Sequence, residues 1–163
     1  MSTAPAEYPI LFRTGVIADV SAVGRLSRAS FDPHYREAWT DVQMAAVLAG
    51  PGGALLLLEE ETGLVAFALC RQILDESELL LCAIRPDRRR LGIGRRLMAE
   101  IAQYYRIHGA CRIFLEVREG NHAARRLYES CGYRPQGRRP AYYHDMDGVA
   151  IDAITLSLQL QPV

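Results

Sequence analysis

The chain has 163 residues, half of them hydrophobic, which is enough for one domain with a sizeable core. Its formal net charge is zero, so bulk charge directs it toward neither nucleic acid nor a membrane surface. All 19 basic residues are arginines, and the absence of lysine excludes a P-loop lysine, a Schiff-base lysine and any other catalytic lysine.

The cysteines and histidines give no sign of a metal site or a disulfide framework. Cys70, Cys82, Cys111 and Cys131 are far apart, no CxxC occurs, and the four histidines form no ligand cluster. We therefore expect buried, reduced thiols and no metal. The N-terminus lacks a basic segment followed by an apolar one, and all apolar stretches are short. These features predict a cytoplasmic protein without an export signal or a membrane span.

In the N-terminal half, the patterns predict helices followed by a run of strands. Asp19 can cap the first helix, which has Val20, Val23 and Leu26 as its apolar side chains. Residues 1–7 are typical of a flexible tail, attached to a single domain that spans 1–163. We expect a strand at 8–13, a helix at 19–30, an irregular connection at 31–35, a shorter helix at 39–48, and strands at 54–59, 64–74 and 78–84.

In the C-terminal half, helices and strands alternate. Ile93, Leu97 and Ile101 mark one face of a long helix that ends at Gly109. We expect a strand at 112–117, a helix at 121–130, and strands at 133–138 and 150–160. The order β-α-α-β-β-β-α-β-α-β-β predicts an α/β fold, with a mixed sheet of six to seven strands and about four helices covering both faces.

The segment RRRLGIGRRL, from Arg88 to Leu97, connects the strand at 78–84 to the long helix. Gly92 and Gly94 lie where this helix begins, and glycines there expose unpaired backbone N–H groups and let a ligand approach the main chain. The helix dipole adds positive potential, and the arginines offer bidentate phosphate contacts. The pattern therefore favours a pyrophosphate-binding loop over a solvated basic turn.

A Rossmann dinucleotide loop is a competing interpretation of the same segment. Gly92-x-Gly94 is present, and Glu116 follows at the end of the next strand. However, Leu97 takes the place of the third glycine, and seven residues separate Ile84 from Gly92 where that fold requires a tight turn. These departures disfavour a dinucleotide site.

Three motifs resemble those of a known family. Arg89-x-x-Gly92-x-Gly94 is similar to the pyrophosphate-binding motif R/Q-x-x-G-x-G/A of the GNAT acetyltransferases. LEVREGNHAARRLYESCGY, at 115–133, and GRRPAYY, at 137–143, resemble segments of the GNAT members that acetylate the N-terminal alanine of a small-subunit ribosomal protein. Ala38-Trp39-Thr40 lies where those proteins have a short tryptophan motif, and the likeness extends from about residue 10 to residue 160.

This resemblance implies a GNAT fold and acetyl-CoA as co-substrate, with no metal. The fourth strand would contact the pantetheine and the thioester through its main chain, which makes Cys82 a small strand residue rather than a nucleophile. The implied acetyl-CoA-binding residues are Cys82, Ala83, Ile84, Arg89, Arg90, Leu91, Gly92, Ile93, Gly94, Arg95, Asn121 and Tyr128.

The resemblance also implies a catalytic pair. Glu116 is the candidate general base, although its spacing alone fits a solvent-exposed glutamate at a strand end. Tyr128 is the candidate general acid, although its position also fits the core, and Asn121 can bind pantetheine or cap a helix. A phenol near pKa ~10 is a weaker acid than a thiol near ~8.5, so complete proton donation is uphill by ~2 kcal/mol. We therefore expect Tyr128 to stabilise the thiolate by hydrogen bonding unless its pKa is lowered.

For the acceptor, the resemblance implies the α-amine of a protein N-terminus. An α-amine has a pKa near ~8, against ~10.4 for lysine, so a modest base is sufficient. Tyr35, Trp39, Tyr142 and Tyr143 are expected to line the acceptor groove. Two departures lie beside it: the family often has asparagine before the paired tyrosines, where Pro140-Ala141 stands here, and an acidic residue where Ile151 stands here.

Two other classes of function remain compatible with these residues. One is acetylation of a small-molecule amine or a lysine side chain, because GNAT proteins use many acceptors on one scaffold. The other is a non-enzymatic acyl-CoA sensor or an arginine-rich nucleic-acid binder. Zero net charge and the concentration of arginines at one loop argue against nucleic acid as a partner.

Overall fold

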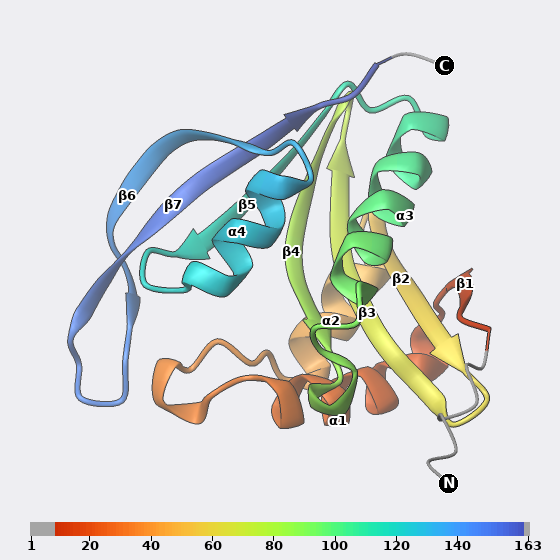
Figure 1. Ribbon diagram of the computed structural model, residues 1–163, viewed down its shortest axis with the longest axis horizontal. Coiled ribbons are helices and arrows are strands. Elements are labelled where there is room, and N and C mark those ends of the chain that lie inside the picture. The colour runs from red at the N-terminus through yellow and green to blue at the C-terminus, as the bar shows by residue number, and fades with distance from the viewer. Residues whose placement is uncertain (1–8, 162–163) are drawn as a thin grey trace, which may run out of the picture.

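A mixed sheet of seven strands, in the order β1-β2-β3-β4-β5-β7-β6, is the frame of the computed structural model, which describes residues 9–161 (Figure 1). The predicted tail at 1–7 lies outside the described residues. The strands are β1 (Leu11–Thr14), β2 (Gly53–Glu60), β3 (Gly63–Ile73), β4 (Glu76–Ile84), β5 (Arg112–Arg118), β6 (Arg134–His144) and β7 (Ala150–Gln159). Within the described part, β4 and β5 form a parallel pair and the other neighbouring strands pair antiparallel.

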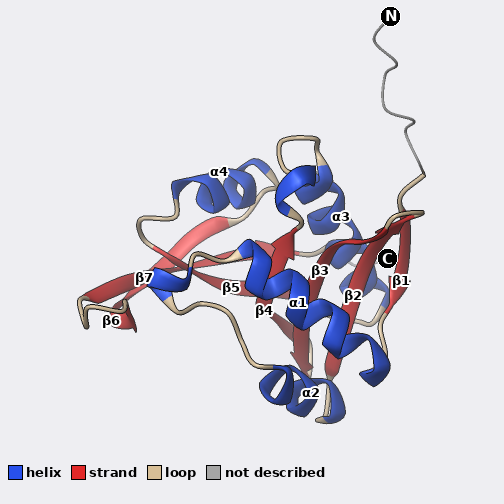
Figure 2. Cartoon of the chain, turned by 90° about the horizontal axis from the view of Figure 1, so that it is seen from below, coloured by secondary structure: helices blue, strands red, loops and turns tan. Residues whose placement is uncertain are grey.

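Helices cover both faces of the sheet, as the sequence predicts (Figure 2). They are α1 (Val20–Ser30), α2 (Asp41–Ala49), α3 (Ile93–Ile107) and α4 (His122–Ser130). Leu55 and Leu57 pack into the core beneath α1 and α2, whereas Leu56 and Leu58 pack into the core beneath α3 and α4. Because both faces are buried, β2 is continuously apolar rather than alternating. No helix within residues 9–161 is long and apolar enough to cross a membrane.

Two helix starts differ from the predicted ones. Asp19 precedes α1, but its side chain does not cap that helix. Its carboxylate instead accepts hydrogen bonds from Arg13 and from the Val16 amide, and the contact with Arg13 lowers the pKa of Asp19 to about 2. The second helix begins at Asp41 rather than residue 39, because the Thr40 hydroxyl accepts the Gln43 amide and so caps the helix.

The sixth strand is longer than the predicted range of 133–138, because it continues through a bulge. Arg139 and Tyr143 are register partners of Ala153 and Ile151, so three residues of β6 lie opposite Asp152 alone. Pro140 lies in this bulge, and β6 is an edge strand, where a missing N–H is tolerated.

The expectation of buried thiols is only partly met. All four cysteines are free. Cys70 is buried, Cys82 and Cys131 are half-buried, and Cys111 is exposed beside Asp75. Cys111 is exposed because it precedes β5 at the end of the sheet, beyond the core that covers the strand interior.

Candidate active site

The parallel strands β4 and β5 separate halfway along their length. Their register ends at Leu79 and Leu115, with no further pair between them among the described residues, and the two strands run apart in Figure 1. At this point β4 has a bulge, because Leu79 and Leu81 are partners of adjacent residues of β3 and Leu80 is extra. A bulge bends and twists its strand. The edge of β4 at 82–84 that faces β5 therefore has no ladder partner.

The bulge also decides which side chains face which layer. Leu79, before it, packs into the core beneath α3 and α4, whereas Leu81, after it, packs into the core beneath α1 and α2. Cys82 consequently faces the α3/α4 layer. In β5 the residues on both sides of Glu116 face that same layer, so Glu116 faces the opposite one. Cys82 and Glu116 thus border the split between the strands from opposite faces.

On the α3/α4 face, Tyr128 of α4 reaches the split. Its hydroxyl oxygen lies 3.4 Å from the Cys82 sulfur. Burial, together with the neighbouring Cys82, raises the pKa of Tyr128 well above its usual value, and burial also raises the pKa of the Cys82 thiol. Tyr128 is therefore a neutral hydroxyl that can donate a hydrogen bond, and Cys82 is a neutral thiol with little nucleophilic character.

On the α1/α2 face, Glu116 is mostly withdrawn from solvent, with its side chain 16% exposed. Its Oε1 accepts a hydrogen bond of 2.6 Å from Arg139, while its buried Oε2 has no partner among the described residues. The guanidinium of Arg139 also lies 4.1 Å from the ring centre of Tyr142. The structure thus argues against a strand-end glutamate in open solvent, and it leaves one buried carboxylate oxygen without a hydrogen-bond partner among the described residues.

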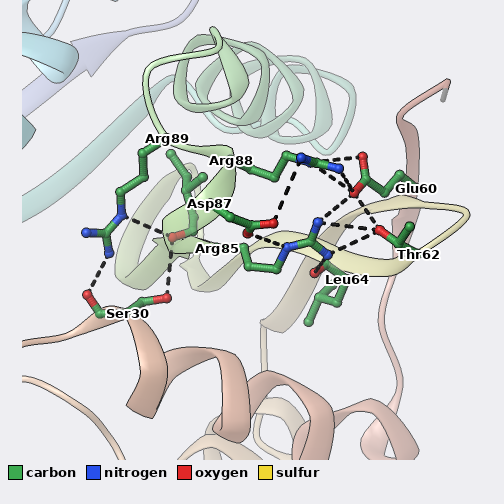
Figure 3. A network of polar contacts seen from close by, with 9 residues as sticks. Ser30, Glu60, Thr62, Leu64, Arg85, Asp87, Arg88 and Arg89 are labelled. Carbon is green, nitrogen blue, oxygen red and sulfur yellow. Dashed lines mark hydrogen bonds and ion pairs between the residues drawn. The ribbon is translucent and has the colours of Figure 1, made fainter. Parts of the chain in front are cut away.

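The arginines around the loop divide into those that are paired within the protein and those that remain exposed. Arg85 and Arg88 belong to the paired set (Figure 3). Both pair with Glu60 at the end of β2, at 2.6 Å and 2.8 Å. The Glu60 side chain is 5% exposed, and its hydrogen bonds, with Arg88 the largest cause, lower its pKa to about 2. This ion-pair network attaches the start of the loop to the β2–β3 hairpin.

Arg89 also has structural partners, which the sequence did not predict. In Figure 3 its guanidinium turns away from Glu60, toward the end of α1. It donates to the carbonyl oxygen of Ser30 at 2.6 Å and to that of Ile84 at 3.3 Å. Because these contacts join β4 to α1, Arg89 contributes to the scaffold of the loop.

The helix start itself remains open. The backbone amides from Leu91 to Arg95 have no acceptor among the described residues, and the bond from the Arg96 amide to the Gly92 carbonyl is the first of the helix. Arg90 and Arg95 are exposed and form no ion pair within the described part of the chain, whereas Arg96 pairs with Glu100. Unpaired amides at a helix N-terminus together with free guanidinium groups suit an anion.

The two glycines of the loop have different reasons to be glycine. Gly92 has φ of 81°, and a Cβ there would meet nothing within 4 Å. A Cβ at Gly94 would lie 2.8 Å from Leu127 and 3.1 Å from Ile84. Gly92 therefore serves the backbone conformation, and Gly94 lets α3 pack closely against α4 and β4.

Asn121, which the sequence leaves as a pantetheine ligand or a helix cap, is a cap in this structure. Its side-chain oxygen accepts a 3.2 Å hydrogen bond from the Ala124 amide, at the start of α4. The side-chain NH₂ group has no acceptor among the described residues and is available for a ligand.

The residues expected at the acceptor groove separate into two groups. Tyr142 and Tyr143 lie on β6 beside Glu116, and burial, together with nearby carboxylates, raises the pKa of both. Tyr35 lies against Arg118 of β5, 3.5 Å from ring centre to guanidinium. Trp39 lies apart from these tyrosines and packs, partly buried, against the core beneath α1 and α2.

Sequence reasoning missed several residues of this region. Glu37 and Arg118 form a mostly buried pair at 3.6 Å, and burial raises the pKa of Glu37. Arg139 belongs to the segment GRRPAYY at 137–143, but nothing in this segment indicates its contact with Glu116. No spacing rule reveals these residues, because they come from three separate segments.

The segment before α2 also contacts the turn between β6 and β7. The Met146 amide donates to the His34 carbonyl at 2.8 Å, and the His34 ring lies 3.3 Å from Asp145. His34, Asp145 and Asp147 place possible ligand atoms within 4.8 Å, which corrects the expectation that no histidine joins such a cluster. Asp145 already accepts two backbone amides of its own turn.

A hollow of about 430 Å³ adjoins Glu116 along β4 and β5. Phe114 and Thr155 contribute to its wall. Its charged lining consists of Asp75, Glu76, Glu78, Glu116 and Arg71, and Arg71 is paired with Glu78. An elongated acceptor with positive charge would complement this lining.

Comparisons with known proteins agree with this geometry. The model of the acetyltransferase (GNAT) family matches residues 21–133. The ribosomal protein bS18-alanine N-acetyltransferase of Escherichia coli is 37% identical over 103 residues, which are 63% of this chain and 69% of that protein. Its counterpart in Haemophilus ducreyi is 32% identical over 101 residues, 62% of this chain and 70% of that protein.

Solved structures share the fold. The crystal structure of the ribosomal-protein-S18-alanine N-acetyltransferase from Escherichia coli has a TM-score of 0.85 and 28% identity, covering 95% of this chain and 96% of that one. A GNAT superfamily phosphinothricin acetyltransferase from Sinorhizobium meliloti, solved in complex with acetyl-CoA, has a TM-score of 0.76 and 17% identity, covering 94% and 93%. The predicted fold is confirmed, and the chain belongs to the GNAT family of acetyltransferases.

Proposed function

We propose that the protein transfers the acetyl group of acetyl-CoA to the α-amine of a protein N-terminus. An N-terminal alanine, as in the ribosomal protein that the curated relatives are named for, is the proposed acceptor. The observation that carries this proposal is the placement of Tyr128 and Glu116 on opposite faces of the split between β4 and β5. A base on one face and a hydrogen-bond donor on the other suit direct transfer between two bound substrates.

The chain has groups that fit acetyl-CoA. The unpaired amides from Leu91 to Arg95, with Arg90 and Arg95, suit the phosphates, and the open edge of β4 at 82–84 suits the amide-rich pantetheine. When bound, acetyl-CoA supplies a thioester, which is both the acyl donor and the source of the leaving thiolate. Arg89 is left out of this set because its Nε and Nη2 groups already donate to main-chain carbonyls.

In this proposal Glu116 removes the proton that the acceptor amine loses, directly or through water. Tyr128 donates a hydrogen bond to the departing sulfur and keeps its own proton, because its raised pKa opposes ionisation. Cys82 forms no covalent bond to the acetyl group. The nitrogen–carbon bond forms as the carbon–sulfur bond breaks, so one attack completes the transfer.

The surroundings of Glu116 support a peptide acceptor. The hollow beside it extends along the sheet and has room for the residues that follow an N-terminal amine. At neutral pH about a tenth of α-amines are already unprotonated, against under ~0.1% of lysine amines. A base that acts at modest strength therefore favours a chain end.

The test is coenzyme A release with a peptide that begins with alanine. The same peptide with an acetylated N-terminus is one control, and an N-terminally blocked peptide containing an internal lysine is the other. We expect release with the free N-terminus alone. Equal or faster release with free lysine, a polyamine or an aminoglycoside at the same concentration would contradict the N-terminal acceptor and leave the acetyltransferase assignment intact.

A further inference from the structure

We propose that Arg139 is a positioning residue for Glu116, holding one carboxylate oxygen so that the other remains free for the acceptor amine. This inference rests on the proposed role of Glu116 as the base. Its first support is the contact between Arg139 and Glu116 Oε1 at 2.6 Å, beside a buried Oε2 that has no partner among the described residues. A carboxylate withdrawn from water is costly to leave without a hydrogen-bond donor, and Arg139 supplies a donor of opposite charge.

The second support is the bulge in β6, which orients the Arg139 side chain toward Glu116. The three-residue bulge after Arg139 is held by Asp152, which accepts the Ala141 amide at 2.9 Å and the Arg138 guanidinium at 2.6 Å. Within this bulge, the Tyr142 ring lies against Arg139. Arg138 and Arg139 therefore make different contacts, since Arg138 stabilises the bulge through Asp152 and Arg139 donates to Glu116.

The charged and polar groups that face Glu116 show why the contact with Arg139 matters. Glu78 of β4 lies on the same face of the sheet, two residues from the level of Glu116. Tyr142 and Tyr143 of β6 face it as well, and beyond Tyr143 are Glu37 from the segment before α2 and Arg118 of β5. Without Arg139, the Glu116 carboxylate would lose the cation that donates to it, while the carboxylate of Glu78 would remain on the same face of the sheet.

The experiment compares three variants with the wild type. Arg139→Met removes the charge at similar length, Arg139→Lys keeps the charge without the planar fork, and Arg134→Met is the matched control. Arg134 is on the same strand but bonds to main-chain carbonyls away from Glu116. The measurements are kcat and the separate KM values across pH, with an alanine-initiated peptide or with any amine that the enzyme prefers.

For Arg139→Met we expect kcat to fall by about tenfold or more. The acid limb of kcat/KM should move to higher pH by about one unit, because an opposite charge beside the carboxylate is lost. KM for acetyl-CoA should not change. Arg139→Lys should restore the position of the acid limb while recovering part of kcat, and Arg134→Met should behave as the wild type.

A double-mutant cycle with Glu116→Gln separates this inference from the proposed function. In the Glu116→Gln background, Arg139→Met should cause little further loss, since both changes act through one carboxylate. If Glu116→Gln is itself fully active, the proposed base is wrong. If Glu116→Gln is impaired while Arg139→Met keeps the wild-type profile, or gains activity, the positioning role is wrong. Should Arg139→Met fail to fold, Arg139→Gln provides the same comparison, and an unshifted acid limb in it would overturn the inference.

Discussion

The two faces of the split between β4 and β5 are built in different ways. On the α3/α4 face, the groups proposed to bind phosphate are successive backbone amides of one helix start, and the Tyr128 hydroxyl projects from the next helix. On the α1/α2 face, the wall around Glu116 combines side chains from β5, β6 and the segment before α2. One face thus depends mainly on local backbone conformation, and the other on long-range side-chain contacts. We call the α1/α2 face the acceptor face and the α3/α4 face the cofactor face, after their proposed substrates. Substitutions on the acceptor face should therefore lower activity more than substitutions on the cofactor face.

The largest effect should come from Glu116, at the centre of the acceptor face. We expect Glu116→Gln to lower kcat/KM by about 10²-fold, as loss of a general base does, with acetyl-CoA affinity unchanged. The defect should shrink as pH rises, because more acceptor amine is already unprotonated. Steady-state kinetics at several pH values provide the measurement. Wild-type kinetics across the whole range would show that Glu116 has no catalytic role.

Tyr128, on the opposite face, should have a somewhat smaller effect. We expect Tyr128→Phe to lower kcat by at least about tenfold through loss of one hydrogen bond to developing negative charge. Because burial raises the pKa of Tyr128, the hydroxyl stays protonated through neutral and moderately alkaline pH, so it should add no alkaline limb there. Cys82→Ala is the matched control, since it removes the group that Tyr128 contacts. Activity that depends more on Cys82 than on Tyr128 would instead indicate an acetyl-cysteine route.

The phosphate-binding arginines should matter less, because backbone amides share the task. We expect the double substitution of Arg90 and Arg95 by alanine to raise KM for acetyl-CoA about tenfold at low salt, and less at high salt. Arg89→Ala, in contrast, should lower the melting temperature, because it removes the link between β4 and α1. Thermal melts and acetyl-CoA titrations separate these outcomes. If Arg89→Ala instead raises KM alone, Arg89 is a phosphate ligand after all.

The smallest effect on activity should come from Glu60, which lies behind the loop. Its folded pKa of about 2 is below the ordinary value near ~4.3, so its stabilising contribution is present above ~4.3 and is lost as pH falls toward 2. We expect Glu60→Gln to reduce the dependence of the melting temperature on pH in this window while kcat at neutral pH changes little. A variant whose melts depend on pH as strongly as the wild type would show that Glu60 does not contribute.

Several residues have contacts that the sequence did not predict. Arg89 and Trp39 fit ligand contacts by residue type and position, and Asp19 fits a helix cap. In the structure they are engaged by carbonyl oxygens, by the core and by Arg13, respectively. Such competing partners come from distant segments, and a local motif contains no information about them. The extra length of β6 was missed for a related reason, because pairing with β7 and the Asp152 contacts carry the strand past Pro140.

The sequence by itself determined the features that depend on short-range periodicity and backbone chemistry. These are the order of helices and strands, the coverage of both faces of the sheet by helices, and the glycine-rich helix start with its unpaired amides. Only the tertiary structure decided which arginines remain free, that a bulge in β4 turns Cys82 toward Tyr128, and that Arg139 holds Glu116. Side-chain pairing across strands depends on register and on bulges, and these are set when distant segments compete for the same hydrogen bonds.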